Sequence, residues 1–274
     1  MSLGSVLEAV VASRDTAAAA RFLSEAFGWE VLGSGQDWTL TGLPGSPAGR
    51  VRLVAAEEDV RLPEPVFWEP GPRLLGIYST DLDRTEEQVT RAGGRVGPIA
   101  TFDAGLSTPL RERLAWGPDD LLWTIPDYEP RLPTPAIERD PSRVHGELHS
   151  AVIVVERMDS ALEFFVTAGG MDVVFDGEVG GPEIEAQLGL APGVTLRNAV
   201  LGGDDLAPAR LELVQVFGAE PPPPVRRRIG LRELVFGCDD PATTMDALLR
   251  AGGTRRGPAR LGGPGGVDLT FRVI

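Results

Sequence analysis

The chain contains no lysine, and this absence excludes several classes of enzyme. All 26 basic residues among the 274 are arginines, so no side-chain amine is available to form a Schiff base with a carbonyl substrate or with pyridoxal phosphate. The single cysteine, Cys238, permits neither an internal disulfide nor a cage of thiolates around a metal ion. Histidine is also scarce, with only His145 and His149. Schiff-base chemistry, an internal disulfide and a metal site built from thiolates are therefore excluded.

Long apolar runs and an excess of positive charge are absent as well. The net charge is −14, and an acidic surface repels nucleic acid and anionic membranes. No apolar run approaches the length of a membrane-spanning helix, and no signal-peptide pattern is present. We therefore expect a cytoplasmic protein, monomeric or homodimeric, that has neither nucleic acid nor a membrane as its partner.

A long-range repeat is the most informative pattern in the chain. The sequence Arg-Ala-Gly-Gly at 91–94 returns at 250–253, an offset of 159 residues. The aspartates Asp81 and Asp240 keep the same offset, and each follows an apolar run and opens a short helical pattern. Self-similarity at a fixed offset is evidence about the whole fold. The sequence therefore indicates that one ancestral unit has been duplicated.

The same template occurs twice more, in a looser form. Asp15 and Asp159 each follow an apolar run and precede a helical pattern that ends in glycine, at Gly28 and at Gly169-Gly170. Such aspartates can accept hydrogen bonds from the first free helix amides, and such glycines can end a helix. Alternating apolar residues predict strands after each helix, at 38–40, 50–54, 121–125, 194–201, 210–216 and 269–273. The sequence thus predicts four βαβββ modules.

Four such modules, with several short motifs in the right order, resemble the vicinal oxygen chelate superfamily. This superfamily contains glyoxalase I, bleomycin-resistance proteins and extradiol dioxygenases, and the resemblance covers nearly the whole chain. The motifs that carry it lie at 20–22, 27–31, 81–83, 91–94 and 117–120. The resemblance implies an α+β fold in which four βαβββ modules pair into two half-barrel, glyoxalase-like domains, and it implies a small-molecule ligand. Because one fold hosts many chemistries, the motifs carry less information about function.

The module boundaries predict two domains of ordinary size. The first domain spans residues 1–128 with modules at about 4–57 and 71–128, and the second spans 147–274 with modules at about 147–217 and 229–274. A linker rich in proline and polar residues separates them at 129–146. Members of the superfamily pair their modules either sequentially or by exchange. The short breaks inside each half favour sequential pairing, but the linker permits both arrangements.

The resemblance also implies where a metal ion would bind. In the superfamily the ligands come from the first and the last strand of each module. Counting along the strands places His149 and Glu212 at these positions in the third module, and Glu233 and Thr270 in the fourth. A site made of His149, Glu212 and Glu233 would suit one divalent ion, such as Ni, Zn, Mn or Mg, in the second domain. Thr270 replaces a carboxylate that the superfamily also uses as a base.

The first half of the chain offers no such donor set. The same count gives Glu8, Arg52, Leu74 and Thr124, which cannot bind a metal ion. Glu8 and Arg52 are instead expected to form an ion pair or to line a pocket for a polar ligand. Because His145 and His149 lie in or beside one strand, the two-histidine triad of an extradiol dioxygenase is excluded.

Two functions remain open, and no catalytic residue is assigned. The first is metal-free binding or sequestration of a small molecule in a sheet cup, in the manner of bleomycin-resistance proteins, and the absence of a carboxylate at Thr270 favours it. The second is a metal-dependent, glyoxalase-like lyase or isomerase that uses the site in the second domain. The predicted ligands also have plain structural alternatives: His149 as a partner of a backbone carbonyl, Glu212 on a solvated sheet surface, and Glu233 in an exposed ion pair.

Overall fold

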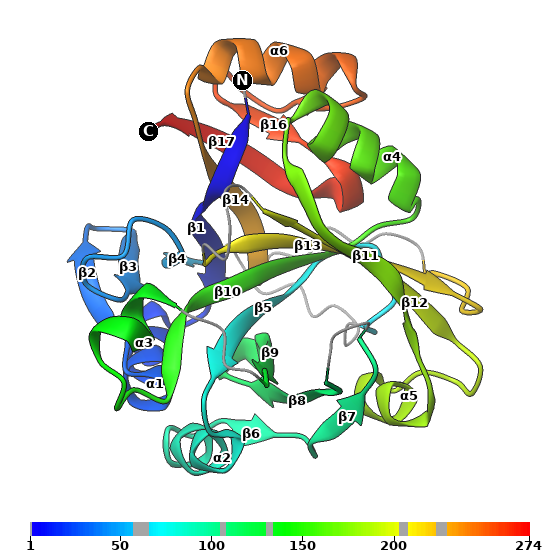
Figure 1. Ribbon diagram of the computed structural model, residues 1–274. Helices are drawn as coiled ribbons and strands as arrows, with labels where there is room; N and C mark the ends of the chain where they lie inside the picture. Colours follow the sequence, from blue (N-terminus) through cyan, green and yellow to red (C-terminus); the bar gives the residue numbers. More distant parts are fainter. Residues whose placement is uncertain (1, 57–65, 105–107, 130–133, 203–207, 223–228) are drawn as a thin grey trace.

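The computed structural model describes residues 2–56, 66–104, 108–129, 134–202, 208–222 and 229–274. The chain folds into two mixed β-sheets with helices packed between and around them, which is the predicted α+β class (Figure 1). Within the described residues, no helix is both long enough and apolar enough to span a membrane.

Sheet A combines the first and the fourth module. Its eight strands follow the order β15-β16-β17-β14-β1-β4-β3-β2. The strands from the N-terminal module are β1 (Leu3–Ser13), β2 (Glu30–Ser34), β3 (Trp38–Gly42) and β4 (Arg50–Ala55). Those from the C-terminal module are β14 (Gly230–Cys238), β15 (Thr254–Arg255), β16 (Arg260–Gly262) and β17 (Asp268–Val273). The first strands of the two modules, β1 and β14, pair antiparallel at the centre of the sheet.

Sheet B combines the second and the third module. Its main path is β11-β12-β13-β10-β5-β9-β8-β6, and β7 pairs with β8 beside this path. The second module supplies β5 (Gly71–Ser79), β6 (Arg95–Val96), β7 (Ala100–Phe102), β8 (Leu110–Trp116) and β9 (Leu122–Asp127). The third supplies β10 (His145–Val154), β11 (Asp172–Gly180), β12 (Thr195–Gly202) and β13 (Arg210–Phe217).

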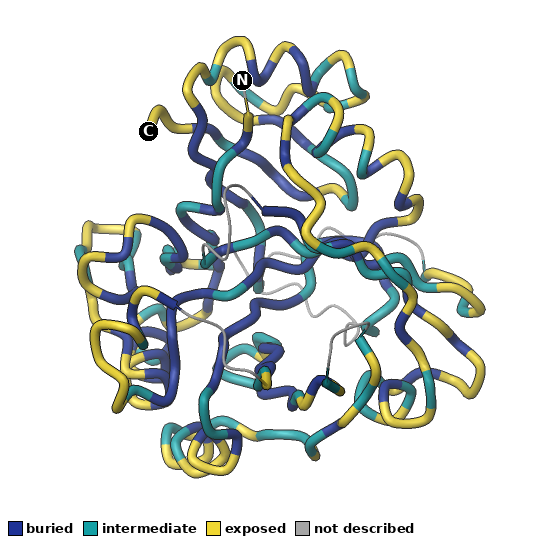
Figure 2. The backbone as a smooth tube through the Cα atoms, in the orientation of Figure 1, coloured by how far each residue is buried: buried dark blue, intermediate teal, exposed yellow. Residues whose placement is uncertain are grey.

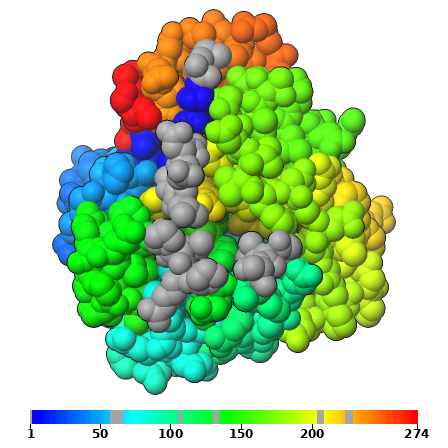
Figure 3. Space-filling model, viewed as in Figure 1, coloured from blue at the N-terminus to red at the C-terminus, as the bar shows by residue number. Residues whose placement is uncertain are grey.

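The modules are therefore paired by exchange, and the predicted division into sequential domains 1–128 and 147–274 does not match the sheets. The N-terminal and C-terminal segments lie side by side, as the blue and red atoms show (Figure 3). The pairing of first strands is a contact between distant parts of the chain, and the lengths of the connecting segments do not determine it. The linker at 129–146 includes a short helix, α3 (Pro135–Arg139), and its residues 130–133 lie outside the described part of the chain.

Three helices begin as the aspartates predict. Helices α1 (Thr16–Phe27), α2 (Leu82–Arg91) and α6 (Pro241–Arg250) follow Asp15, Asp81 and Asp240, whose carboxylates accept hydrogen bonds from amides in the first turn. Helix α1 ends at Gly28, where φ is 67° and only glycine is unstrained. These local signals fix the helix boundaries independently of the sheets.

The fourth helix begins differently from the prediction. Helix α4 (Met158–Leu162), which continues as a π-helix over Glu163–Ala168, has Arg157 at its N-cap. Its first amide, that of Met158, donates to the side-chain oxygen of Gln215 at 2.8 Å. Asp159 instead forms an ion pair with Arg197 at 2.8 Å. A residue from β13 thus replaces the predicted aspartate cap.

One hydrophobic core joins the two sheets. Both sheets direct every second side chain toward the helices, and these residues are buried (Figure 2). Phe27 of α1 lies at the centre, with its ring centroid 5.0 Å from that of Trp123 and 6.3 Å from that of Trp29. Gly117 is needed for close packing, because a Cβ there would lie 2.7 Å from the ring of Phe22. The opposite face of each sheet, called the inner face below, lies outside this core.

Helix α5 (Pro182–Leu188), which the sequence analysis missed, covers part of the inner face of sheet B. It lies between β11 and β12 and packs against β7 at the other end of the sheet (Figure 1). A second apolar cluster forms between this region and the sheet. Its members include Ile184 and Leu188 of α5 with Leu74, Val152, Val154, Leu196 and Val214 of the strands.

Candidate functional site

The strand registers define four equivalent inner positions in each sheet. In each module the first and last strands pair in parallel, and the inner residue of the last strand lies opposite the residue two places after the inner residue of the first strand. Arg52 lies opposite Val10, two places after Glu8. Glu212 lies opposite Val152, two places after Ser150. In sheet A these positions hold Glu8, Arg52, Glu233 and Thr270. In sheet B they hold Leu74, Thr124, Ser150 and Glu212. The set of sheet A joins the first and last modules of the chain, and the set of sheet B joins two consecutive modules.

The three predicted metal ligands are not brought together. Glu233 lies in sheet A, whereas His149 and Glu212 lie in sheet B. The first-strand position of the third module is Ser150 rather than His149, because β10 has a bulge between Leu148 and Ser150 that shifts the register by one residue. Among the described residues, no group of three His, Cys, Asp or Glu side chains could hold a metal ion. The predicted donor set therefore does not fit a metal ion.

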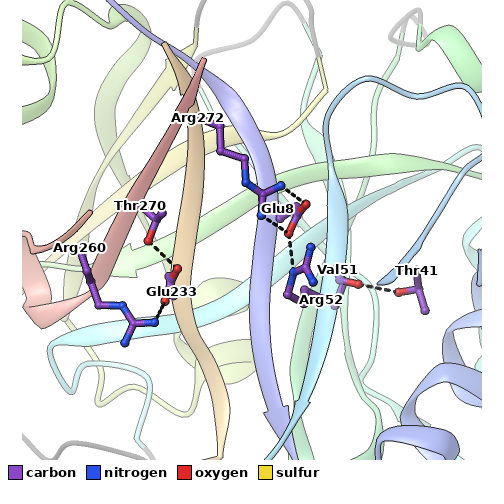
Figure 4. A network of polar contacts seen from close by, with 8 residues as sticks. All are labelled: Glu8, Thr41, Val51, Arg52, Glu233, Arg260, Thr270 and Arg272. Atoms are coloured by element: carbon purple, nitrogen blue, oxygen red, sulfur yellow. Dashed lines mark hydrogen bonds and ion pairs between the residues drawn. The ribbon is translucent and has the colours of Figure 1, made fainter. Parts of the chain in front are cut away.

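In sheet A the predicted ion pair between Glu8 and Arg52 is present. The carboxylate of Glu8 accepts a hydrogen bond from Nε of Arg52 at 2.7 Å and hydrogen bonds from both terminal nitrogens of Arg272 (Figure 4). Burial alone would raise the pKa of Glu8, but the hydrogen bonds and charges of the two guanidinium groups outweigh it and lower this pKa. Arg52 also stacks over the ring of Trp38, 4.5 Å from its centroid.

The second carboxylate of sheet A is neutralised in the same way. Glu233 accepts a hydrogen bond from Oγ1 of Thr270 at 2.6 Å and forms an ion pair with Arg260 at 2.6 Å (Figure 4). Both carboxylates at the equivalent positions of sheet A thus have an arginine partner. The inner face of sheet A is a network of internal ion pairs.

In sheet B the equivalent carboxylate has neutral partners. Glu212 of β13 accepts hydrogen bonds from Oγ of Ser150 at 3.1 Å and from Nδ2 of Asn198 at 2.9 Å. Burial raises the pKa of Glu212, and the two hydrogen bonds oppose this rise only in part. The side chain faces the inner surface, so the alternative of a solvated outer sheet surface does not apply.

A second carboxyl group, that of Glu112 on β8, faces the same surface. Glu112 lies opposite Pro126 in the ladder with β9, next to the pair Leu114 and Thr124. Burial and the charge of Glu212 raise its pKa to about 7. The two groups lie on different strands, β8 and β13, of the same sheet, and the charge of Glu212 acts on Glu112. Glu112 is therefore protonated in a large fraction of molecules near neutral pH.

His149 and Tyr128 lie beside the two carboxyl groups. Nε2 of His149 and the hydroxyl of Tyr128 are 3.1 Å apart, and they share one hydrogen bond. Burial, assisted by the charge of Arg210, lowers the pKa of His149 to about 3. Burial and the nearby carboxylates raise the pKa of Tyr128. Both rings are therefore neutral over the physiological range, and His149 is a hydrogen-bond partner of a side chain.

Three buried polar atoms on this surface have no hydrogen-bond partner among the described residues: Oγ1 of Thr124, Oδ1 of Asn198 and Oε1 of Gln187, a residue of α5 that contacts Glu112. The Thr124 hydroxyl lies close enough to Glu112 to favour its charged form, but it makes no hydrogen bond of good geometry. Most buried polar atoms in proteins are hydrogen-bonded, so atoms without partners mark a place where a ligand or water binds. The polar half of the inner face of sheet B is thus the candidate functional site.

Comparison with known proteins identifies the fold. Glyoxalase I from Zea mays is 17% identical, with a TM-score of 0.69 over 97% of this chain and 91% of that chain. A point mutant of the maize enzyme gives 18% identity, a TM-score of 0.69 and coverage of 98% and 93%. A Bacillus subtilis protein, whose name assigns it only provisionally as a dioxygenase, is 10% identical, with a TM-score of 0.64 over 99% of this chain and 86% of that chain. No protein-family model matches the sequence, and no curated protein matches it either.

These similarities over nearly the full chain show that the chain has the fold of glyoxalase I. The resemblance drawn from the sequence motifs is confirmed at the level of the fold. At identities below 20% the similarity does not extend to activity. The function must be argued from the residues on the inner faces of the two sheets.

Proposed function

We propose that the protein binds a small organic molecule on the inner face of sheet B, without a metal ion. The observation that carries this proposal is the set of polar groups left without protein partners there. Thr124 and Asn198 each have an unpaired buried oxygen, beside the carboxyl groups of Glu112 and Glu212. An apolar cluster adjoins these groups on the same face. Small-molecule sites typically combine apolar walls with a few converging polar groups.

The metal-dependent alternative lacks ligands in both sheets. The four equivalent positions of sheet B contain one carboxylate, Glu212, beside Leu74, Thr124 and Ser150. Sheet A contains two, but Arg52, Arg272 and Arg260 already neutralise Glu8 and Glu233. Binding a divalent ion there would require breaking these ion pairs. Binding or sequestration therefore explains the residues better than a metal-dependent lyase or isomerase.

Two measurements together test this proposal. Elemental analysis of protein purified without chelator should find no stoichiometric divalent metal, even after incubation with Ni, Zn, Mn or Mg. A thermal-unfolding screen of small molecules should find compounds that raise the midpoint for the wild type and for Glu233→Gln, but not for Glu212→Gln. One metal ion per chain, lost in Glu212→Gln, would overturn the proposal, as would stabilising compounds that are insensitive to Glu212.

A further inference from the structure

We propose that the ligand of sheet B is a small organic cation, a protonated amine with an apolar body, that binds between Glu112 and Glu212. This inference rests on the proposed function and adds the chemical class of the ligand. Three features of the inner faces support it: the charge balance, the positions of the unpaired acceptors and the apolar surface beside them.

The first feature is a contrast in charge between the two sheets. In sheet A, Glu8 and Glu233 each form ion pairs with arginine at the inner face. In sheet B, no described arginine lies within ion-pair distance of Glu112 or Glu212, although the chain has 26 arginines. Two carboxyl groups that face each other without a counter-ion are unfavourable when both are charged. A bound cation would remove this cost.

The nearby charged side chain does not serve as that counter-ion. Arg210 lies on the same strand as Glu212, but its electrostatic effect falls on His149 and Tyr128. No described arginine contributes to the pKa of Glu112 or of Glu212. The described residues thus supply no positive charge to the two carboxyl groups, and a bound cation would supply it.

The second feature is the distribution of hydrogen-bond acceptors. Thr124 is only 7% exposed, and its hydroxyl oxygen is unpaired. Asn198 donates its amide nitrogen to Glu212, so its unpaired oxygen points to the other side of the amide group. Among the described residues, the carboxyl groups of this face belong to no group of three His, Cys, Asp or Glu side chains that could hold a metal ion. An ammonium group carries three N–H donors in different directions and can satisfy several of these acceptors.

The third feature is the apolar surface that continues from the polar groups. Leu74 precedes Gly76 on the same face, and Val152 and Val214 follow Ser150 and Glu212 on their strands. Helix α5 packs on these side chains through Ile184 and Leu188. These side chains are 2–3% exposed, so a ligand would instead contact partly buried members of the cluster on the same face. Leu122 precedes Thr124 on β9, and Phe102 pairs with Leu110 beside Glu112. An amine with an aromatic or alkyl body matches the carboxyl groups and these apolar side chains.

The carboxyl pair also predicts that binding releases a proton. Near neutral pH one proton resides on Glu112, whose pKa is about 7. The titratable groups that interact with it are Glu212 and Tyr128, and His149 and Arg210 adjoin Tyr128. Neither the histidine nor the tyrosine changes charge between about pH 5 and pH 8. A cation binds the ionised form of Glu112. Its affinity should therefore rise about tenfold per pH unit below pH 7 and level off above it.

A charge series of one scaffold tests the inference. Benzylamine, benzyl alcohol and benzoate share their apolar body and differ in charge, and each is titrated into the full chain by calorimetry at about pH 6 and about pH 8. We expect benzylamine alone to bind, more tightly at the higher pH, with proton release detected in buffers of different ionisation enthalpy. Glu112→Gln and Glu212→Gln should each weaken benzylamine binding at least about tenfold. Glu233→Gln, in sheet A, should bind as the wild type does.

Several results would overturn the inference. If benzyl alcohol or benzoate equals benzylamine in affinity and Glu212→Gln abolishes all binding, the proposed binding site stands, but its ligand is not a cation. Benzylamine binding that is insensitive to both glutamate substitutions would also overturn it. Stoichiometric metal lost in Glu212→Gln would overturn both proposals. Circular dichroism confirms that each variant is folded, and if Glu212→Gln unfolds, Glu112→Gln and the pH dependence of the wild type decide the question.

Discussion

Gly76 of β5 lies directly against the hydroxyl group of Ser150 on β10. A Cβ atom at position 76 would lie 2.4 Å from Oγ of Ser150 and 3.3 Å from Cγ2 of Thr124. The same hydroxyl donates to Glu212. The absence of a side chain at Gly76 therefore allows two neighbouring strands to hold Ser150 and Thr124 beside the carboxylate.

This relationship predicts the effect of a single methyl group. Gly76→Ala should push the Ser150 hydroxyl away from Glu212 and destabilise the protein by about 2 kcal/mol, through overpacking and a lost hydrogen bond. Urea unfolding monitored by circular dichroism measures the change. Gly97→Ala is the matched control, because its Cβ would meet the ring of Trp116 at an ordinary 3.6 Å. Equal stability of the two variants would show that the β5–β10 contact is looser than described.

The raised pKa of Glu112 predicts a pH-dependent gain in stability on substitution. The folded state binds this proton more tightly than the unfolded state does, so the stability that Glu112 contributes is fully present below about pH 4.5 and is lost as the pH rises through about 7. Glu112→Gln removes this loss. We expect the variant to exceed the wild type by about 2 kcal/mol at pH 8 and to equal it at pH 4. A pH series of urea unfolding curves measures this difference, and a constant offset at every pH would contradict it.

The ion pairs of Glu8 predict the opposite effect on stability, a loss on substitution. Glu8→Gln leaves Arg52 and Arg272 without their shared carboxylate and should destabilise the protein by about 2 kcal/mol at neutral pH. Because the folded-state pKa of Glu8 is lowered, the stabilisation by Glu8 is present above its unfolded value of about 4.5 and is lost as the pH falls through the lowered pKa. The difference between variant and wild type should therefore shrink in acid.

An exposed ion pair provides the control for Glu8. Arg111 and Asp127 are 3.1 Å apart, and the side chain of Arg111 is 50% exposed. Arg111→Ala should change the free energy of unfolding by less than about 1 kcal/mol, because solvent screens such a pair. If Glu8→Gln costs no more than Arg111→Ala in the same urea titration, the network on sheet A does not stabilise the fold.

The unusual start of helix α4 gives a fourth prediction. Gln215→Ala removes the acceptor of the Met158 amide and should cost about 1 kcal/mol, the usual cost of a lost helix cap. Asp159→Ala removes a residue whose side chain is 86% exposed and should cost less than about 0.5 kcal/mol. Thermal unfolding of both variants distinguishes the two caps. A larger loss in Asp159→Ala would mean that the aspartate caps the helix as the sequence predicts.

The helices could be predicted from the sequence where their signals are local. Asp15, Asp81 and Asp240 accept hydrogen bonds from amides two or three residues away, so spacing alone reveals their role. Asp159 lies inside its helix, and Gln215, 57 residues from Met158, accepts the hydrogen bond of the first helix amide instead. The sequence holds no local trace of that contact. The same limit applies to the pairing of modules, which depends on strands from opposite ends of the chain.

The site could be predicted in part. Counting along the strands correctly places Glu8, Arg52 and Glu212 on inner faces, because side chains alternate in a strand. The count fails by one residue at His149, where a bulge interrupts the alternation. Glu112 is not among the predicted site residues because no strand is predicted over β8. The alternation of Leu110, Glu112 and Leu114 on one face of that strand is the signal that could have indicated it.

The exchanged pairing makes the chain interwoven. Each half of the sequence contributes one module to each sheet, so a cut at Asp140, in the segment between α3 and β10, would separate no structural unit. The two resulting fragments would remain joined through the β1–β14 and β5–β10 ladders and through the shared core. Neither half can fold as an autonomous domain, but the two halves expressed separately should reassemble into one molecule, which makes this protein suited to fragment complementation.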